Sequence, residues 1–275
     1  MNIFITGASS GIGNALAHEY AKRNRMTSEN NASASRMVIG LAARRIKALE
    51  MLAAELQSQY NITCAIYPLD VRDATALEAA AQDFIAKFGA PNIVIANAGV
   101  SRGTLTEDKD DIKAIQAIFD INVMGLVYTF QPFISAMKLA AANGEAAQLI
   151  GVASVAGIRG IPGSGAYSAS KAAVISYCES LRTEMQHFNI AVSTIAPGYI
   201  RTPMTELNPY KMPFLMDADV FAHKFANAVK AKRRFVIIPW QMGWVARFMR
   251  FIPPFLWDWA MKNAPHKKRM NWDWL

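Results

Sequence analysis

Three side chains with useful chemistry lie in one segment, between Val152 and Val174. Tyr167 and Lys171 are four residues apart, so on a helix both side chains lie on one face, one turn apart. An isolated tyrosine holds its proton to about pH 10, and a nearby lysine cation favours the phenolate and lowers that pKa. Ser154 precedes them across a glycine-rich turn, and its hydroxyl can hold a carbonyl oxygen that Tyr167 protonates. Together these groups could reduce a ketone or oxidise an alcohol.

The Tyr167–Lys171 pair has a second interpretation. YxxxK arises often by chance, and a Tyr/Lys pair at this spacing is usually an ordinary helix surface. The meaning of the pair therefore depends on the elements that position it.

Short apolar segments alternate with helical segments along the chain. The apolar runs predict strands at 2–5, 37–42, 62–69, 93–96, 149–153, 190–196 and 235–238. A helix over 166–187 carries Tyr167 and Lys171. This alternation predicts an α/β fold, a single doubly wound Rossmann-type domain with a parallel sheet of about seven strands and helices on both faces. Ligands bind such sheets at the carboxyl ends of the strands.

A glycine-rich turn, TGASSGIG, follows the first strand and precedes a helical pattern that runs through Lys22. Glycine lets the backbone approach a pyrophosphate, and the following helix offers free N–H groups and the positive end of its dipole. The spacing GxxxGxG differs from the better-known GxGxxG, but the physics is shared. The predicted dinucleotide contacts in this turn are Gly7, Ser9, Ser10, Gly11, Ile12 and Gly13.

The end of the second strand favours NADP over NAD. In a dinucleotide fold an acidic residue here binds the ribose 2′-hydroxyl of NAD, whereas arginine accommodates the 2′-phosphate of NADP. This chain has no acid at that point and has Arg44 and Arg45 instead. The alternative is that they merely begin a solvated helix, although a cation is poorly placed at a helix N-terminus. We expect NADP(H) as the cofactor, with NAD less favoured.

Two short motifs that each begin with a polar residue follow the third and fourth strands, Asp70-Val71 and Asn97-Ala98-Gly99, and we expect both to contact the cofactor. The Asp70 carboxylate can accept a hydrogen bond from the adenine amine. Asn122 lies in an otherwise apolar helical stretch, where an amide needs buried partners. Either Asn122 is a satisfied core asparagine, or it holds a water beside Lys171.

Composition narrows the class of protein. The chain has 275 residues, a net charge of +8 and a pI of about 9.5, which suits phosphate-bearing ligands or anionic surfaces. No nucleic-acid-binding motif is visible. Cys64 and Cys178 lie outside any CxxC, and the four histidines lack ligand spacing, so we expect no disulfide framework and no metal. The first strand begins too early to leave room for a signal peptide, no apolar run reaches 18 residues, and we expect a cytoplasmic protein.

The motifs in this order resemble the short-chain dehydrogenase/reductase superfamily over roughly residues 2–204. The resemblance rests on TGASSGIG, Asp70, Asn97-Ala98-Gly99, Asn122, Ser154, YSASK at 167–171 and PGYIRT at 197–202. It implies a catalytic tetrad of Asn122, Ser154, Tyr167 and Lys171, in which Tyr167 is the acid/base, Ser154 orients the substrate and Lys171 binds the nicotinamide ribose. It also implies cofactor contacts by Pro197, Gly198, Ile200 and Thr202, and a homo-oligomer. A basic residue often found before Gly11 in NADP-preferring members is Ser10 here.

The sequence therefore predicts an NADP(H)-dependent oxidoreductase that interconverts a carbonyl and a secondary alcohol on a fairly apolar, small substrate. The alternative is an NADP(H)-binding sensor or scaffold without significant turnover.

Residues 24–35 are polar and predict a solvated loop. Residues 199–216 are rich in Met, Tyr and Phe among prolines, and predict a loop-rich lid, with ordinary packing as the alternative.

A different composition begins at residue 240, so we expect a catalytic domain over 1–239 and an aromatic, basic extension over 240–275. The six tryptophans of the chain all lie in this extension: Trp240, Trp244, Trp257, Trp259, Trp272 and Trp274. Pro253-Pro254 should divide it into two short helices. The extension could pack on the catalytic domain, meet a partner subunit, or lie peripherally on the inner membrane surface through its aromatic and basic residues.

Overall fold

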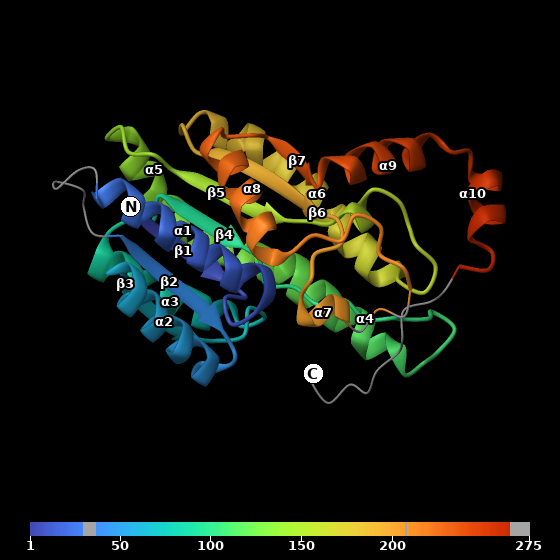
Figure 1. Cartoon of the computed structure of the whole chain (residues 1–275), viewed down its shortest axis with the longest axis horizontal. Coiled ribbons are helices and arrows are strands. Elements are labelled where there is room, and N and C mark those ends of the chain that lie inside the picture. Colours follow the sequence, from blue (N-terminus) through green and yellow to red (C-terminus); the bar gives the residue numbers. More distant parts are fainter. Residues whose placement is uncertain (30–36, 207, 209, 265–275) are drawn as a thin grey trace.

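The computed structural model describes residues 1–29, 37–206, 208 and 210–264. Within these residues, seven parallel strands form one sheet in the order β3-β2-β1-β4-β5-β6-β7, which confirms the predicted α/β architecture (Figure 1). The strands are β1 (Asn2–Thr6), β2 (Val38–Ala43), β3 (Thr63–Pro68), β4 (Ile93–Ala96), β5 (Gln148–Val152), β6 (Ala191–Pro197) and β7 (Phe235–Ile238). The strand order reverses between β1 and β4, and this switch point is where such sheets bind ligands.

Helices cover both faces of the sheet. One face packs against α1 (Gly11–Glu29), α2 (Ile46–Tyr60) and α8 (Ala218–Lys230). The other packs against α3 (Ala74–Phe88), α5 (Gly125–Ala142) and α6 (Gly165–Gln186). The remaining helices are α4 (Asp111–Phe119), the π-helical turn η1 (Asp120–Met124), the 3₁₀ turn η2 (Val155–Gly157), α7 (Pro203–Glu206), α9 (Trp240–Phe251) and α10 (Pro254–Met261).

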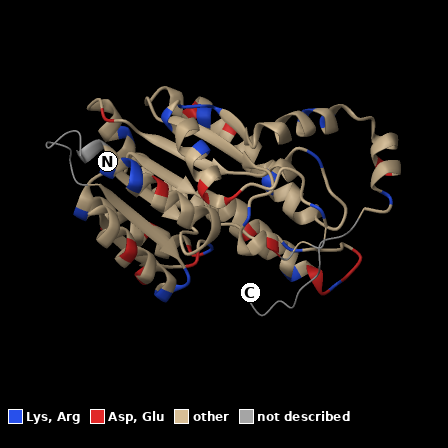
Figure 2. Ribbon diagram, viewed as in Figure 1, with Lys and Arg blue, Asp and Glu red and all other residues tan. Residues whose placement is uncertain are grey.

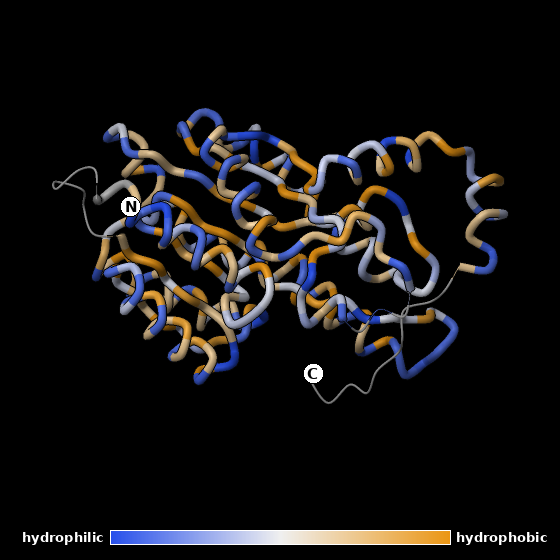
Figure 3. The backbone as a smooth tube through the Cα atoms, viewed as in Figure 1, coloured by the Kyte–Doolittle hydropathy of each residue, from blue (hydrophilic) through white to orange (hydrophobic). Residues whose placement is uncertain are grey.

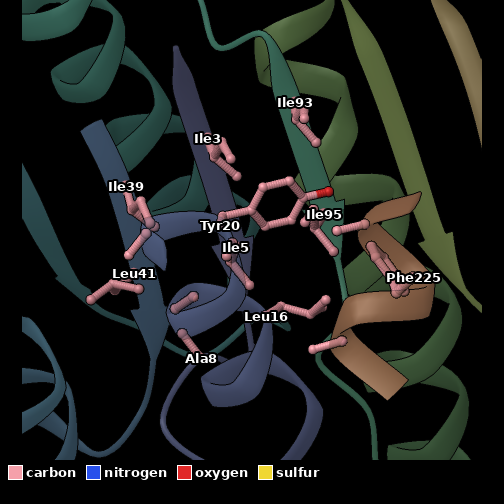
Figure 4. Close-up of a cluster of buried hydrophobic side chains, with 14 of the residues drawn as sticks. Ile3, Ile5, Ala8, Leu16, Tyr20, Ile39, Leu41, Ile93, Ile95 and Phe225 are labelled. Atoms are coloured by element: carbon pink, nitrogen blue, oxygen red, sulfur yellow. The ribbon is translucent and has the colours of Figure 1, made fainter. Parts of the chain in front are cut away.

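Alternation along β1 explains how one strand serves two cores. Ile3 and Ile5 point into the cluster beneath α1 and α8, whereas Phe4 points into the cluster beneath α3 and α5. Figure 4 shows the first cluster, in which Tyr20 of α1 and Phe225 of α8 meet the isoleucines of β1 and β4. Both faces of the strand are buried, as expected for a parallel sheet between two helical layers.

One long helical segment bears on the prediction that no apolar run is long enough to span a membrane. The segment Asp111–Ala142, which joins α4, η1 and α5, is long and apolar enough to cross a membrane by length and composition alone. Half of its most apolar window is buried inside the protein, where Leu126, Phe130 and Phe133 pack in the core. Packing against the sheet accounts for this composition.

The predicted polar loop at 24–35 is partly wrong, because α1 continues as far as Glu29. The stretch 24–29 contains neither glycine nor proline, so nothing in it ends a helix that is already formed. Residues 30–35 lie outside the described part of the chain.

The predicted division of the C-terminal extension is confirmed. α9 ends at Phe251 and α10 begins at Pro254. Proline lacks a backbone N–H and blocks a continuing helix, yet it suits the first turn of a new one.

Candidate active site

A cleft of about 460 Å³ opens at the carboxyl ends of the strands. It is lined by most of the residues that the sequence predicts for cofactor and catalysis: Gly7, Ser9, Ser10, Gly11, Ile12, Arg44, Arg45, Asp70, Val71, Asn97, Ala98, Gly99, Ser154, Tyr167, Lys171, Pro197, Gly198, Ile200 and Thr202. Residues up to 195 positions apart in sequence meet here because the strands are parallel, so their carboxyl ends lie at the same edge of the sheet. Gly13 and Asn122 do not line the cleft and lie behind its wall.

The glycine-rich turn after β1 forms one wall of the cleft. Gly7 and Gly11 have positive φ values of 70° and 57°, which residues with a Cβ rarely adopt. A Cβ on Gly7 would lie 2.8 Å from the Ala98 Cα, and one on Gly13 would collide with the Gly7 carbonyl oxygen. Asn97 fixes the turn by donating from Nδ2 to the Thr6 carbonyl (3.0 Å). The turn is therefore a rigid, closely packed cradle at the start of α1.

Arginine side chains cover the outer edge of this cradle. Arg45 donates to the hydroxyl oxygens of Ser9 (3.0 Å) and Ser10 (2.6 Å). Arg44 lies 3.7 Å from an Asp70 carboxylate oxygen. A glycine turn, a helix N-terminus and two arginines make a site that fits a phosphate-bearing nucleotide.

Arg72 is a charged neighbour that the sequence reading missed. Its guanidinium donates to both carboxylate oxygens of Asp70, to Oδ2 at 2.8 Å and to Oδ1 at 3.1 Å. Partial burial alone would raise the pKa of Asp70, but the hydrogen bonds and charge of Arg72, with Arg44, hold it below its usual value. Asp70 is therefore an ionised acceptor that lines the cleft. In the sequence, the pairing is indicated only by the position of Arg72 two residues after Asp70.

Ser154, Tyr167 and Lys171 come together at the inner end of the cleft. Ser154 lies just after β5, with its hydroxyl oxygen accepting from the Ala156 N–H (3.2 Å). Tyr167 and Lys171 lie one turn apart near the start of α6, and the Lys171 Nζ is 6.0 Å from the Tyr167 ring centroid. Lys171 is buried and donates to the Val152 carbonyl (2.8 Å). The helix thus presents both side chains to one point, as their spacing predicts.

Burial governs the pKa values of Tyr167 and Lys171 in this structure, and the lowering of the Tyr167 pKa by Lys171 stays a prediction. Burial raises the pKa of Tyr167, and the interaction with Ser154 only partly offsets this. Burial also lowers the pKa of Lys171 to about 8. Tyr167 therefore holds its proton at neutral pH in this structure, while Lys171, with a pKa of about 8, is still mostly a cation there.

Asn122 is held by the protein itself. Its Oδ1 accepts from the Val100 N–H (2.8 Å), and its Nδ2 donates to the Val100 carbonyl (3.0 Å) and the Ser170 hydroxyl (2.9 Å). These bonds match the interpretation of a satisfied core asparagine. They also connect the segment after β4 with α6, next to Lys171. A water held by Asn122 remains a prediction.

The segment after β6 closes the far side of the cleft. Thr202 approaches the glycine turn, since a Cβ on Gly11 would lie 3.2 Å from its methyl carbon. Thr205 was not predicted, yet it lines the cleft and ties the segment together by donating to the Ile200 carbonyl (2.6 Å) and accepting from the Thr202 N–H (3.0 Å).

Six other lining residues were missed because they are apolar neighbours of the predicted ones, and no motif marks them. They are Ala43, Leu69, Val100, Ile121, Val152 and Ala153. Pro203 and Met204 also line the cleft and belong to the segment 199–216, for which the sequence predicts a lid. The segment 199–216 also places Tyr210 near the site, with its ring 6.3 Å from that of Tyr199. Burial, together with Tyr199 and Tyr167, raises the pKa of Tyr210 to about 12.

Comparison with known proteins identifies the family. Residues 1–211 match the family described as short chain dehydrogenase. The chain belongs to the short-chain dehydrogenase/reductase family. An uncharacterised oxidoreductase of Myxococcus xanthus is 32% identical over 259 residues, which cover 94% of this chain and 95% of the relative. The resemblance seen in the sequence is thereby confirmed.

Two solved structures share the fold over nearly the whole chain. A short-chain dehydrogenase/reductase of Burkholderia phymatum in complex with NAD has a TM-score of 0.76 at 22% identity, covering 98% of each chain. A short-chain dehydrogenase of Sphingobium yanoikuyae in complex with NADPH has a TM-score of 0.74 at 21% identity, with the same coverage. These likenesses show the shared fold, and the family match makes the chain an oxidoreductase of the short-chain dehydrogenase/reductase family. One of the two neighbours was solved with NAD and the other with NADPH.

Proposed function

We propose that this protein is an NADP(H)-dependent reductase that converts a fairly apolar ketone or aldehyde to an alcohol, with Tyr167 as the acid/base. The observation that carries this proposal is the meeting of Ser154, Tyr167 and Lys171 in the cleft that begins at the glycine-rich turn. A protein that only senses the nucleotide has no need of a proton donor at that point.

The nicotinamide ring, when bound, supplies the hydride for the carbonyl carbon or accepts it in the reverse direction. The chain's own residues handle the oxygen. Ser154 donates a hydrogen bond to the carbonyl oxygen and holds it beside Tyr167. The Tyr167 hydroxyl then gives its proton to that oxygen, which becomes the alcohol, and the remaining phenolate is stabilised by Lys171. A Tyr167 that keeps its proton at neutral pH is in the state that reduction requires.

The preference for NADP(H) rests on the arginines at the outer edge of the cleft. Arg44 and Arg45 line it where the adenosine ribose would lie, and no acidic residue follows β2 to bind a free 2′-hydroxyl. Asp70 follows β3 and is already paired with Arg72. The arginines therefore supply positive charge for a 2′-phosphate.

The apolar character of the substrate rests on apolar side chains in the cleft that also holds Tyr167. Val100, Ile121 and Met204 are among its lining residues. In the described part of the segment 199–216, Tyr199 and Tyr210 pack against each other with ring centroids 6.3 Å apart, and we propose that this part acts as a lid over the substrate.

The test is a panel of apolar ketones, aldehydes and quinones, each with NADPH and NADH, followed by loss of nicotinamide fluorescence. We expect turnover of at least one class with NADPH, and a lower kcat/KM with NADH. Tight NADPH binding with no turnover over the whole panel would instead favour the sensor alternative. Equal kcat/KM with the two cofactors would overturn the proposed preference alone.

A further inference from the structure

The C-terminal helices α9 and α10 have an outer surface that the catalytic domain does not use. They follow β7 and extend along one end of the molecule (Figure 1). The inner side of α9 packs on the domain, with Met242 and Ala246 buried and Met249 packed beside them against Val155. This contact fixes which side of α9 faces outward.

The outward side is strongly aromatic. Trp244, Phe248 and Phe251 are 64%, 72% and 83% exposed, and Trp259 of α10 is 80% exposed. We call this surface the aromatic face, and its members are Trp240, Trp244, Phe248, Phe251, Phe255, Leu256 and Trp259. Figure 3 shows the hydrophobic residues that recur along both helices at this end of the molecule. So many large exposed rings on neighbouring helices indicate a binding surface.

The two helices are also held in a defined arrangement. Arg159 donates to the carbonyl oxygens of Met249 and Ile252, both at 2.6 Å, where α9 ends. The same guanidinium lies 4.6 Å from the Trp257 ring of α10. Arg159 thus connects the catalytic domain, the end of α9 and the start of α10, so the aromatic face is a built surface.

Positive charge borders the aromatic face. The Arg247 guanidinium lies 5.4 Å from the Trp244 ring. Arg250 is exposed on the same helix and donates to the Ile158 carbonyl (3.2 Å), and Lys262 follows α10. α9 contains no acidic residue, and α10 contains only Asp258. Figure 2 shows basic residues on α9 and at the end of α10.

We propose that the aromatic face binds the surface of an anionic lipid bilayer. Tryptophan and phenylalanine rings insert at the boundary between head groups and acyl chains, and arginine and lysine beside them attract anionic head groups. Helices of 12 and 8 residues are too short to span the bilayer, so they lie along it. A second copy of the chain fits less well, since pairing two such faces would bring their cations together.

The experiment is co-sedimentation of the full-length protein with vesicles of phosphatidylglycerol and phosphatidylcholine, or of phosphatidylcholine alone, at low salt. We expect the protein to sediment with the anionic vesicles, and to be released as salt screens the attraction. Because every tryptophan lies in residues 240–275, tryptophan emission reports on this region alone. It should shift to the blue on binding and be quenched by brominated lipid.

The decisive variant is W244Q/F248Q/F251Q, which should weaken vesicle binding by at least roughly tenfold, since it removes three inserting rings. The matched control is M51Q/I112Q/L139Q, which changes three exposed apolar residues far from this face on α2, α4 and α5. The control should bind vesicles as the unmodified protein does. R247Q/K262Q should reduce binding to anionic vesicles and leave the fold intact.

Three outcomes would overturn the proposal: unmodified protein that stays in the supernatant at low salt, a triple aromatic variant that sediments as well as the control, or a dimer lost in that variant without any vesicle binding. Circular dichroism and NADPH binding of each variant show that it is folded. Turnover measured on the same samples is independent of vesicle binding, so failure of the proposed activity is distinguished from failure of this inference.

Discussion

The cofactor cleft and the aromatic face depart from the usual relation between polarity and burial in opposite directions. In the cleft and directly behind it, polar side chains such as Lys171, Thr202 and Asn122 are buried. On the aromatic face, tryptophan and phenylalanine side chains are exposed. Most proteins bury large aromatic side chains and expose polar or charged ones.

The difference shows how each region is organised. The buried groups in and behind the cleft are oriented by bonds within the protein, since Lys171 donates to the Val152 carbonyl and Asn122 bonds to Val100 and Ser170. Their cost of desolvation is offset there, and their positions are fixed before any ligand binds. On the aromatic face, Arg159 fixes the position of α9 by donating to the Met249 carbonyl. The exposed rings of α9 remain open to an external partner. The cleft is complete inside the protein, whereas the aromatic face needs a second surface.

The largest expected effect is on turnover by Tyr167→Phe. Loss of the hydroxyl removes the proton donor and little else, so kcat/KM should fall roughly 10²- to 10⁴-fold. The dissociation constant for NADPH should stay nearly unchanged. Tyr177→Phe is the matched control, because Tyr177 lies on the same helix and does not line the cleft. Substantial activity in Tyr167→Phe would show that another group carries the proton.

The next effect concerns the cofactor. Arg44→Gln removes one charged partner of a 2′-phosphate, a contact worth about 1.5–3 kcal/mol. The ratio of kcat/KM for NADPH over NADH should therefore fall by roughly ten- to a hundredfold. Arg182→Gln, on the surface of α6, should leave the ratio unchanged. A ratio that does not move in Arg44→Gln would place recognition of the phosphate elsewhere.

A third effect links the cleft to stability. The pKa of Lys171 is lowered by burial from 10.5 to about 8, so the folded state binds its proton less strongly than the unfolded state does. Stability therefore carries a penalty at pH values below about 8, and this penalty is relieved as the pH rises from about 8 to 10.5.

Lys171→Met should accordingly raise the Tm relative to the unmodified protein at pH 7, although it abolishes turnover. The advantage should shrink between pH 8 and 10.5, as measured by thermal unfolding of both proteins at each pH. A difference in Tm that is independent of pH would mean that Lys171 is not buried as a cation.

The smallest effect is expected on the aromatic face. Phe248→Gln should change the free energy of unfolding by less than about 0.5 kcal/mol, because the ring is exposed. Phe225→Ala, in the core of Figure 4, should lower it by about 3–5 kcal/mol. Denaturant unfolding compares the two variants. A large loss of stability in Phe248→Gln would show that the ring packs within the protein.

The sequence by itself determined the strands, their parallel arrangement and most of the candidate site. This was possible because short apolar runs alternate with helices, and because the motifs follow the strands at whose carboxyl ends ligands bind. Gly7 and Gly11 could be placed in the turn from residue type alone, since positive φ values favour glycine. The break before α10 could be predicted from Pro253-Pro254 for an equally local reason.

Tertiary structure decided what depends on burial and on distant partners. The raised pKa of Tyr167 and the lowered pKa of Lys171 follow from desolvation, which spacing along a helix does not reveal. The bonds of Asn122 to Val100 and of Arg45 to the glycine-rich turn join residues far apart in sequence. In α9, the composition shows that aromatic residues are frequent but not which way they point. The packing of Met242 and Ala246 on the catalytic domain determines that the rings face outward.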